Sequence, residues 1–597
     1  MSRARWLRGA AAVALLAGLA GCAGGGSGGG AAAPWQGLFN VPNIYVRNGA
    51  TTQDDVRVPR AVVFGDSYSV QDPQTPFPFR QWNEQALRSG LFASMSNYAV
   101  GGAEASSTPR SGRSLEQQVD AFLQRDRYSG RELTLVFIGF NDIRLARSIA
   151  EMDAAEADAQ VQFERLRAAG ATADERRVFL LLSPDYGRYP NVADRATRTQ
   201  YTLDWANFLT DYGNANANFV PVDVYTFFER VFRDPAKWGL VNVTTPDPAN
   251  AVGPNATALF YDSVHFGERG HALLAALVEH YLTQAWDWSN TLVAGADTVR
   301  QLNADIDAGL ITAFAGGGKA GETLAFAIGE AESGTETTTF AFAEEGRRGI
   351  GAGLRLTPGL GLALIHAEAG RDLTFARRDG EERTRSRFRA EGVALVGEAL
   401  GFGWTARVTW GHEELARSRF DAVSATGSRG RAEVTHLAFG QRLATSFGVG
   451  GATLSPWVGL DVTRRRIGAY GMADPYLGRV RFGAATVTET LGRAGLRFEL
   501  PPVTVGDGDL RLAADVAVVR DFSDDTVTLR LRQGRFGHRE RVVLAGQDAL
   551  TLGLSGDLTL GDGLRLGAGY GLTRTTAGTE HAAAVRLSWR WPVISVR

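Results

Sequence analysis

The stretch AVVFGDSYSV, residues 61–70, joins an apolar run to a polar turn that contains a serine. Gly-Asp-Ser is ordinary turn chemistry, so the segment alone predicts a buried strand that ends at a tight turn. A strand that ends this way can also deliver Ser67 to the edge of a sheet as a nucleophile. That second interpretation requires a base, a residue that orients the base, and oxyanion donors elsewhere in the chain.

The region around this strand alternates short apolar runs with helical patterns. TLVFIGFND (134–142) and RRVFLLLSP (176–184) are further apolar runs of strand length, and continuous runs of this kind are typical of parallel strands covered on both faces. Helical patterns lie between and after them, as in SLEQQVDAFLQRD (114–126) and GHALLAALVEHYLTQAW (270–286). This alternation predicts a layered α/β domain.

From about residue 330 the pattern changes to period two. In FGWTARVTW (402–410), Trp404, Val408 and Trp410 share one face, and the other face is polar. Runs of about nine to eleven residues suit tilted strands that cross a membrane, and glycine-containing or charged turns separate them. About a dozen such runs favour a transmembrane β-barrel over 330–597 rather than a soluble sandwich or a solenoid, which also alternate.

The amino terminus carries the features of a targeting segment. Three arginines precede GAAAVALLAGLAG, which is too short for a permanent transmembrane helix. The run ends in LAGC, which is similar to the lipobox of bacterial lipoproteins and places Cys22, the one cysteine in the chain, at the lipidation position. We therefore expect a signal peptide at 1–22 and a flexible tether at 23–56, and the alternative is a plain secretory signal.

Three further stretches carry polar residues at the boundaries of predicted elements. NYAVGGAEAS contains Gly102, FIGFNDI contains Asn141, and LFYDSVHFGERGHALLA contains Asp262 and His265. Each has a structural explanation on its own, as a turn glycine, a helix cap or a buried histidine. Together with Ser67 they supply every group that nucleophilic catalysis needs.

The chemistry of this set is complete. His265 can take the proton of Ser67 during attack and return it to the leaving group, while Asp262 orients the imidazole and stabilises its cation. The amide of Asn141 and the backbone N–H groups of Gly102 and Ser67 can hold the oxyanion.

Gly65-Asp66-Ser67, Asn97 to Gly102, Gly139-x-Asn141-Asp142 and Asp262-x-x-His265 resemble the four blocks of GDSL or SGNH hydrolases. The resemblance implies a flavodoxin-like α/β/α sandwich over 57–290 that hydrolyses acyl esters through a serine acyl-enzyme, without a metal or a cofactor. The whole layout resembles that of GDSL esterase autotransporters, whose 12-stranded barrel holds the esterase on the outer membrane. The chain departs from the family at Tyr68, where leucine is common, and this departure bears on the shape of the acyl pocket.

Between the two domains, residues 291–320 contain Val299, Leu302, Ile306 and Leu310 at helical spacing. We expect a linker helix that runs in or near the barrel lumen and breaks at glycines 316–318, and the alternative is a surface helix packed on the hydrolase.

The formal charge of −2 gives no general field for nucleic acid. The expected partners are an acyl-ester substrate, outer-membrane lipid and the outer-membrane assembly machinery, with the chain itself a monomer. Two other functions remain open at this point, a polysaccharide deacetylase of the same family and a non-catalytic surface adhesin.

Overall fold

The computed structural model describes residues 58–71, 77–173, 176–314, 318–336, 341–377, 380–421, 426–524, 526–543, 548–561, 563–575 and 578–591. Within helix α8, it describes the backbone of residues 283–297 but not their side chains. The expected signal peptide, the lipidation site at Cys22 and the tether at 23–56 lie outside the described residues.

A five-stranded parallel sheet forms the centre of the amino-terminal domain. Its strands are β1 (Arg60–Gly65), β2 (Met95–Asn97), β3 (Glu132–Phe137), β4 (Arg177–Leu181) and β5 (Phe219–Val222). Their order is β2-β1-β3-β4-β5, with every neighbouring pair parallel. The apolar runs therefore form parallel strands, and this order is the flavodoxin-like arrangement that the family resemblance implies.

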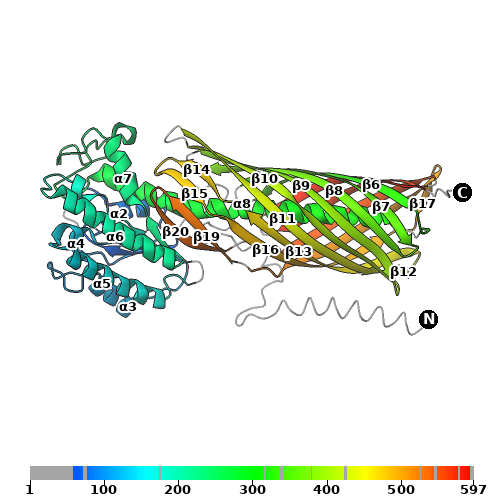
Figure 1. The fold of residues 1–597 in the computed structure, drawn as a ribbon, viewed down its shortest axis with the longest axis horizontal. Helices are drawn as coiled ribbons and strands as arrows, with labels where there is room; N and C mark the ends of the chain where they lie inside the picture. Colours follow the sequence, from blue (N-terminus) through cyan, green and yellow to red (C-terminus); the bar gives the residue numbers. More distant parts are fainter. Residues whose placement is uncertain are drawn as a thin grey trace.

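Helices cover both faces of this sheet (Figure 1). They are α2 (Trp82–Arg88), α3 (Leu115–Arg125), α4 (Phe140–Leu145), α5 (Ile149–Ala168), α6 (Arg195–Ala215), α7 (Val224–Arg233) and α8 (Glu268–Phe314), with the short 3-10 turns η3 (Tyr186–Arg188) and η4 (Ala236–Trp238). One hydrophobic cluster packs α2, α7 and the start of α8 on one face, and a second packs α3, α5 and α6 on the other. Successive residues of β1, such as Val62 and Val63, point into opposite clusters.

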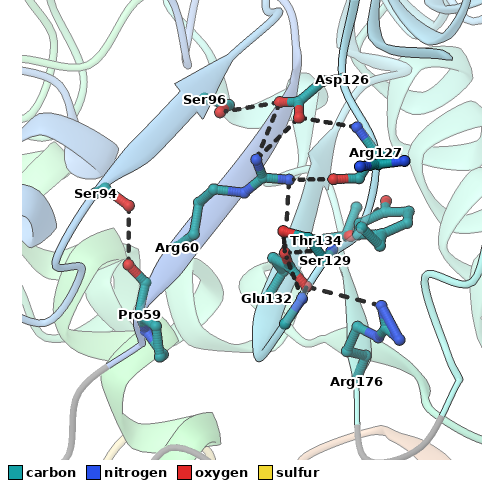
Figure 2. Close-up of polar contacts among 12 residues, drawn as sticks. Pro59, Arg60, Ser94, Ser96, Asp126, Arg127, Ser129, Glu132, Thr134 and Arg176 are labelled. Carbon is teal, nitrogen blue, oxygen red and sulfur yellow. Dashed lines mark hydrogen bonds and ion pairs between the residues drawn. The ribbon is translucent and has the colours of Figure 1, made fainter. Parts of the chain in front are cut away.

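An ion network closes the amino-terminal edge of the sheet (Figure 2). Arg60, the first residue of β1, lies 3.0 Å from Asp126 and 3.7 Å from Glu132, and Arg176 lies 3.8 Å from Glu132. The network ties the start of β1 to the end of α3 and the start of β3. It lies at the opposite edge from Ser67, which follows the carboxyl end of β1.

A single helix of 47 residues, α8, connects the two domains. The sequence predicts one helix at 270–286 and a separate linker helix within 291–320, whereas the structure joins them in one helix. Leu282 still packs in the hydrolase core, and Val299 already packs with barrel side chains. Val299, Leu302, Ile306 and Leu310 all face barrel strands, which places this end of α8 in the lumen (Figure 1).

The carboxyl-terminal domain is a closed antiparallel barrel. Twelve long strands form the ring: β6 (Thr323–Glu336), β7 (Ala341–Thr357), β8 (Leu360–Arg377), β9 (Gly380–Ala399), β10 (Phe402–Asp421), β11 (Thr426–Thr445), β13 (Ala452–Ile467), β16 (Ala485–Glu499), β18 (Gly508–Asp521), β21 (Ala549–Leu560), β22 (Leu564–Thr575) and β23 (Gly578–Trp591). Two three-residue strands, β12 (Phe447–Val449) and β17 (Val503–Val505), extend the hairpins at one end. Pairing of β11 with β13 closes the ring, which confirms the predicted 12-stranded barrel.

The barrel begins at Thr323, earlier than the predicted boundary at residue 330. The first strand does alternate, but its apolar side chains point inward. Leu324, Phe326 and Ile328 are buried against α8, so the strand lacks an outward apolar face. In most other strands the apolar residues face outward, as predicted, and Val408 and Leu552 are exposed on the outer surface.

Strand β6 makes an apolar contact with α8, and elsewhere around the helix the lumen of the barrel is polar. Arg407 of β10 is fully buried between Asp307 of α8, at 2.7 Å, and Asp461 of β13. Thr409 contacts Asn303 of α8 at 3.2 Å. Among the described residues, no helix is both long enough and apolar enough to span a bilayer.

A separate four-stranded sheet lies between the barrel and the hydrolase domain (Figure 1). Its strands are β14 (Tyr470–Asp474), β15 (Gly478–Phe482), β19 (Thr526–Gln533) and β20 (Phe536–Val543). We refer to these four strands and the two turns between β14 and β15 and between β19 and β20 as the platform.

Candidate active site

The turn after β1 presents Ser67 at the carboxyl edge of the sheet. Asp66 shapes this turn, because its carboxylate accepts the backbone N–H of Tyr68 at 3.0 Å and its carbonyl accepts that of Ser69 at 3.0 Å. The side chain of Gln81 donates to the carbonyl of Ser67 at 2.7 Å. The serine is thus held by local backbone and side-chain hydrogen bonds while its own side chain stays partly exposed.

The structure brings Ser67, His265 and Asp262 together. The Oγ of Ser67 lies 2.8 Å from Nε2 of His265, across 198 residues of sequence. On the other side of the ring, Nδ1 of His265 lies 2.8 Å from Oδ2 of Asp262. With the proton on Nδ1, the histidine donates to Asp262 and its Nε2 accepts from the serine hydroxyl, which is the arrangement that general-base activation requires.

The loop that carries the acid and the base is organised by Asp262 itself. Its Oδ1 accepts the backbone N–H groups of Val264 at 2.8 Å and His265 at 2.7 Å. Partial burial raises the pKa of Asp262, but these bonds and the hydrogen bond from the His265 ring outweigh burial and leave the pKa below its ordinary value. The carboxylate therefore stays ionised as the partner of the imidazole.

The two predicted oxyanion residues lie on elements that meet beside Ser67. Gly102 has φ of 77°, a left-handed conformation that favours glycine, and the backbone N–H of Val100 in the same loop donates to the carbonyl of Gly65 at 3.0 Å. Asn141 is buried in the first turn of α4, and its Nδ2 donates to the carbonyl of Ala103 at 3.0 Å. One N–H of this amide holds the loop through Ala103. The amide has a second N–H, which can donate to a substrate oxygen.

Gly139 makes room for α4 to start close to the sheet. It has φ of 98°, and a side chain here would collide with the indole of Trp205. The conformation lets the chain turn directly from β3 into the helix that carries Asn141.

Tyr68, the departure from the family pattern, packs inside the hydrophobic core of the amino-terminal domain. It is fully buried, and its hydroxyl donates to the carbonyl of Val264 at 2.7 Å and lies 2.8 Å from the hydroxyl of Tyr189. The residue after the nucleophile is therefore joined directly to the loop between Asp262 and His265. Sequence reasoning missed this role because its partners are 121 and 196 residues away.

Aromatic side chains form a wall beside the histidine. The ring centroid of Phe77 lies 4.6 Å from that of His265, and Tyr261 lies 5.8 Å from Phe77 and 5.3 Å from Phe79. Such a wall excludes water from one side of the imidazole and offers an apolar surface to a substrate. The sequence places two of these residues together in FPF (77–79) but gives no indication of their contact with His265.

Two buried carboxyl groups, those of Asp66 and Asp142, hold the backbone of the loops that form the site. Asp142 accepts the backbone N–H groups of Ala105 at 2.8 Å and Ser106 at 3.2 Å, which fixes the loop that follows Gly102. Burial raises the pKa of Asp142 to about 6 and that of Asp66 to about 7. These groups hold backbone and do not contact the imidazole.

The second histidine of the motif, His271, has a structural environment. It is buried among Tyr68 and Phe79, and burial lowers its pKa to about 3, so it remains neutral. Within the described part of the chain, no group of three or more His, Cys, Asp or Glu side chains is arranged to hold a metal ion.

Comparison with known families agrees with both halves of this architecture. Residues 62–278 match the family model described as GDSL-like lipase/acylhydrolase, and residues 350–571 match the autotransporter β-domain. The chain is a GDSL-hydrolase autotransporter. The GDSL domain is the passenger and the barrel is the β-domain, which implies an outer-membrane location with the passenger at the surface.

Solved structures resemble each domain separately. The translocator domain of the autotransporter NalP from Neisseria meningitidis is 18% identical, with a TM-score of 0.40 over 51% of this chain and 98% of its own. A lipolytic protein of the G-D-S-L family from Veillonella parvula is 15% identical, with a TM-score of 0.27 over 38% and 98%. An acetylxylan esterase from Geobacillus stearothermophilus is 14% identical, with a TM-score of 0.25 over 38% and 94%. No curated protein matches the chain.

Proposed function

We propose that the passenger is a cell-surface carboxylic ester hydrolase that works through a serine acyl-enzyme. Ser67 attacks the carbonyl carbon of the ester while His265 removes the hydroxyl proton. The protonated imidazole then gives this proton to the alkoxide as the alcohol leaves. A water molecule, activated by the same histidine, releases the acid and regenerates Ser67.

Asp262 and the oxyanion donors lower the barrier of both steps. The ionised Asp262 holds the proton on Nδ1 and stabilises the imidazolium that forms during attack. The Asn141 amide and the N–H groups of Gly102 and Ser67 would stabilise the negative charge on the carbonyl oxygen. We assign Asn141 and Gly102 to the same oxyanion site because the Asn141 amide contacts the loop that carries Gly102, at Ala103.

The observation that carries the proposal is the continuous chain of contacts from Ser67 through His265 to Asp262, at 2.8 Å on each side of the imidazole. A histidine held only for structural reasons has no need of a partly exposed serine hydroxyl on one nitrogen and an ionised carboxylate on the other. A non-catalytic adhesin would gain nothing from this geometry.

The test uses intact cells that display the full chain. A fluorophosphonate probe should label the wild-type protein covalently, and esters of graded acyl length should be hydrolysed at the cell surface. Ser67→Ala should abolish labelling and reduce hydrolysis by several orders of magnitude, with display unchanged. Ser107→Ala, which removes an exposed hydroxyl from a neighbouring loop, is the matched control and should retain both.

Substantial hydrolysis by displayed Ser67→Ala protein would contradict the proposal, because the nucleophile would then lie elsewhere. Including acetylated polysaccharides among the substrates also distinguishes a general ester hydrolase from a polysaccharide deacetylase, since both use the same groups.

A further inference from the structure

Each hydrophobic cluster of the passenger contains a side chain from the β-domain. Leu477, in the turn between β14 and β15, is 4% exposed and belongs to the cluster on the α2, α7 and α8 face. Phe536, at the start of β20, is 6% exposed and belongs to the cluster on the α3, α5 and α6 face. The platform therefore contributes to the core on both sides of the passenger sheet.

Hydrogen bonds at both ends of β5, the edge strand of that sheet, join it to the platform. The N–H of Asn218, the residue before β5, donates to the carbonyl of Arg539 at 3.2 Å, and its Oδ1 accepts the N–H of Arg541 at 2.7 Å. At the other end of β5, Asp223 accepts the N–H of Arg535 at 3.1 Å. An edge strand leaves backbone groups unpaired, and β20 covers this edge.

Two buried polar contacts, an arginine with a glutamate and a histidine with an aspartate, cross the same interface. Arg177 of β4 lies 3.2 Å from Glu540 of β20, and His280 of α8 lies 2.8 Å from Asp474 of β14. Burial raises the pKa of Asp474, but His280 outweighs this effect and holds the pKa well below its ordinary value. Separating the domains would leave such groups without their partners, which is costly unless water replaces them.

The platform is also fixed to the barrel. Tyr470, Met472 and Leu531 of the platform pack with Leu415 and Val434 of the barrel wall in one buried cluster. The platform is thus a rigid extension of the barrel rather than a set of loose loops.

We propose that the platform holds the passenger by noncovalent contacts alone, so that the passenger stays on the β-domain after α8 is cut between them. The contacts combine what stable interfaces use: apolar side chains inserted in both cores, hydrogen bonds at both ends of β5, and buried polar contacts that include the Arg177–Glu540 ion pair. It follows that the passenger is completed by the β-domain and reaches its final packing only when it docks on the platform.

The experiment cuts α8 in the displayed full chain. A recognition sequence for tobacco etch virus protease is inserted within residues 283–297, between the part of α8 packed in the passenger and the part packed in the lumen. Intact cells are treated until an immunoblot shows complete cleavage, and are then washed. We expect more than nine-tenths of the passenger to remain with the cells, detected by an epitope tag and therefore independently of catalysis.

Interface variants show which contacts hold the cleaved passenger. Leu477→Asp combined with Phe536→Asp should release most of it into the wash after cleavage. Thr528→Asp, on the exposed face of β19, is the matched control and should leave retention unchanged. The milder Glu540→Gln removes one buried charge without changing shape and should raise the release rate about tenfold, a test that remains if the double variant is not displayed.

Two results would overturn the proposal. Release of the cleaved wild-type passenger would show that α8 is the tether. Retention of a displayed and cleaved double variant would show that other contacts hold the passenger.

Discussion

The hydroxyl of Tyr68 donates to the carbonyl of Val264 at 2.7 Å, so the residue next to the proposed nucleophile is bonded to the residue next to the proposed base. The turn after β1 and the loop before α8 therefore cannot move independently. A bond of this kind sets the distance between Ser67 and His265 without contacting substrate.

Tyr68→Phe should lower kcat about tenfold and leave KM almost unchanged, because the serine and the histidine would lose part of their alignment. The rate of fluorophosphonate labelling should fall by the same factor. Tyr189→Phe removes the other hydroxyl partner but keeps the bond to Val264, so it should be nearly silent. Equal losses in the two variants would instead indicate a packing role.

Asn141→Ala should reduce kcat by about 10²–10³ with little change in KM, since an oxyanion donor acts mainly in the transition state. Steady-state kinetics on a soluble ester measure this effect. Asp142→Asn is the control, because it disturbs the bonds to Ala105 and Ser106 in the same loop without removing a donor to substrate. The prediction fails if Asp142→Asn costs as much in kcat as Asn141→Ala.

The passenger should lose stability as the pH rises from about 4 to about 7. Burial raises the pKa of Asp66 to about 7, so the folded state keeps a proton that the unfolded state releases near its ordinary pKa. The stabilisation is complete below the unfolded pKa and is lost as the pH passes the folded pKa. Asp66→Asn should remove this contribution, on the order of 2–4 kcal/mol at pH 8.

Calorimetry of the detergent-solubilised full chain at pH 5 and pH 8 checks this prediction. Asp66→Asn should unfold at a higher temperature than wild type at pH 8, with a smaller difference at pH 5. Asp120→Asn, at a partly exposed carboxylate paired with Arg165, should follow the wild-type pH dependence. An Asp66→Asn protein with an unchanged pH dependence would assign the effect to other groups.

The two sides of the barrel wall should respond differently to arginine. Leu552→Arg places a charge on the outer, lipid-facing surface, at a cost of about 2–4 kcal/mol near the bilayer midplane, and should lower the assembled yield. Thr551→Arg should be milder, because Thr551 alternates with the exposed Leu552 along β21 and points to the other face of the strand. Heat-modifiable migration on gels measures assembly, and equal losses at 551 and 552 would argue against a lipid-facing outer surface.

Thr409→Arg should be more damaging than its lumenal position alone suggests. The sequence places Thr409 on the polar face of its strand, which favours tolerance of a charge. In the structure it contacts Asn303 of α8, so a longer side chain would push against the helix. The measurement is the same gel assay.

Much of the fold could be predicted because the determining patterns are local. Continuous apolar runs distinguish the parallel sheet from the alternating barrel strands, and the spacing Asp262-x-x-His265 separates the proposed base from the buried His271. The start of the barrel could not be predicted, because the apolar face of β6 points at α8 and its outward residues are small.

The contacts that support the site could not be predicted from the sequence, because they join segments that are far apart along the chain. Nothing near Tyr68 or Phe77 in the sequence identifies Val264 or His265 as a partner. The platform was missed for a related reason: β14, β15, β19 and β20 alternate like their neighbours, and only the three-dimensional pairing separates them from the transmembrane wall.

Helix α8 also has a mechanical consequence. Its 47 residues make a rod of roughly 70 Å, gripped at one end by the passenger core and at the other by the barrel wall. Because it is packed at both ends, the rod resists tilting of the passenger relative to the barrel, so Ser67 lies at the same height above the membrane in every copy. A substrate of the proposed hydrolase must therefore reach Ser67 by diffusion, because the passenger cannot tilt toward its own membrane.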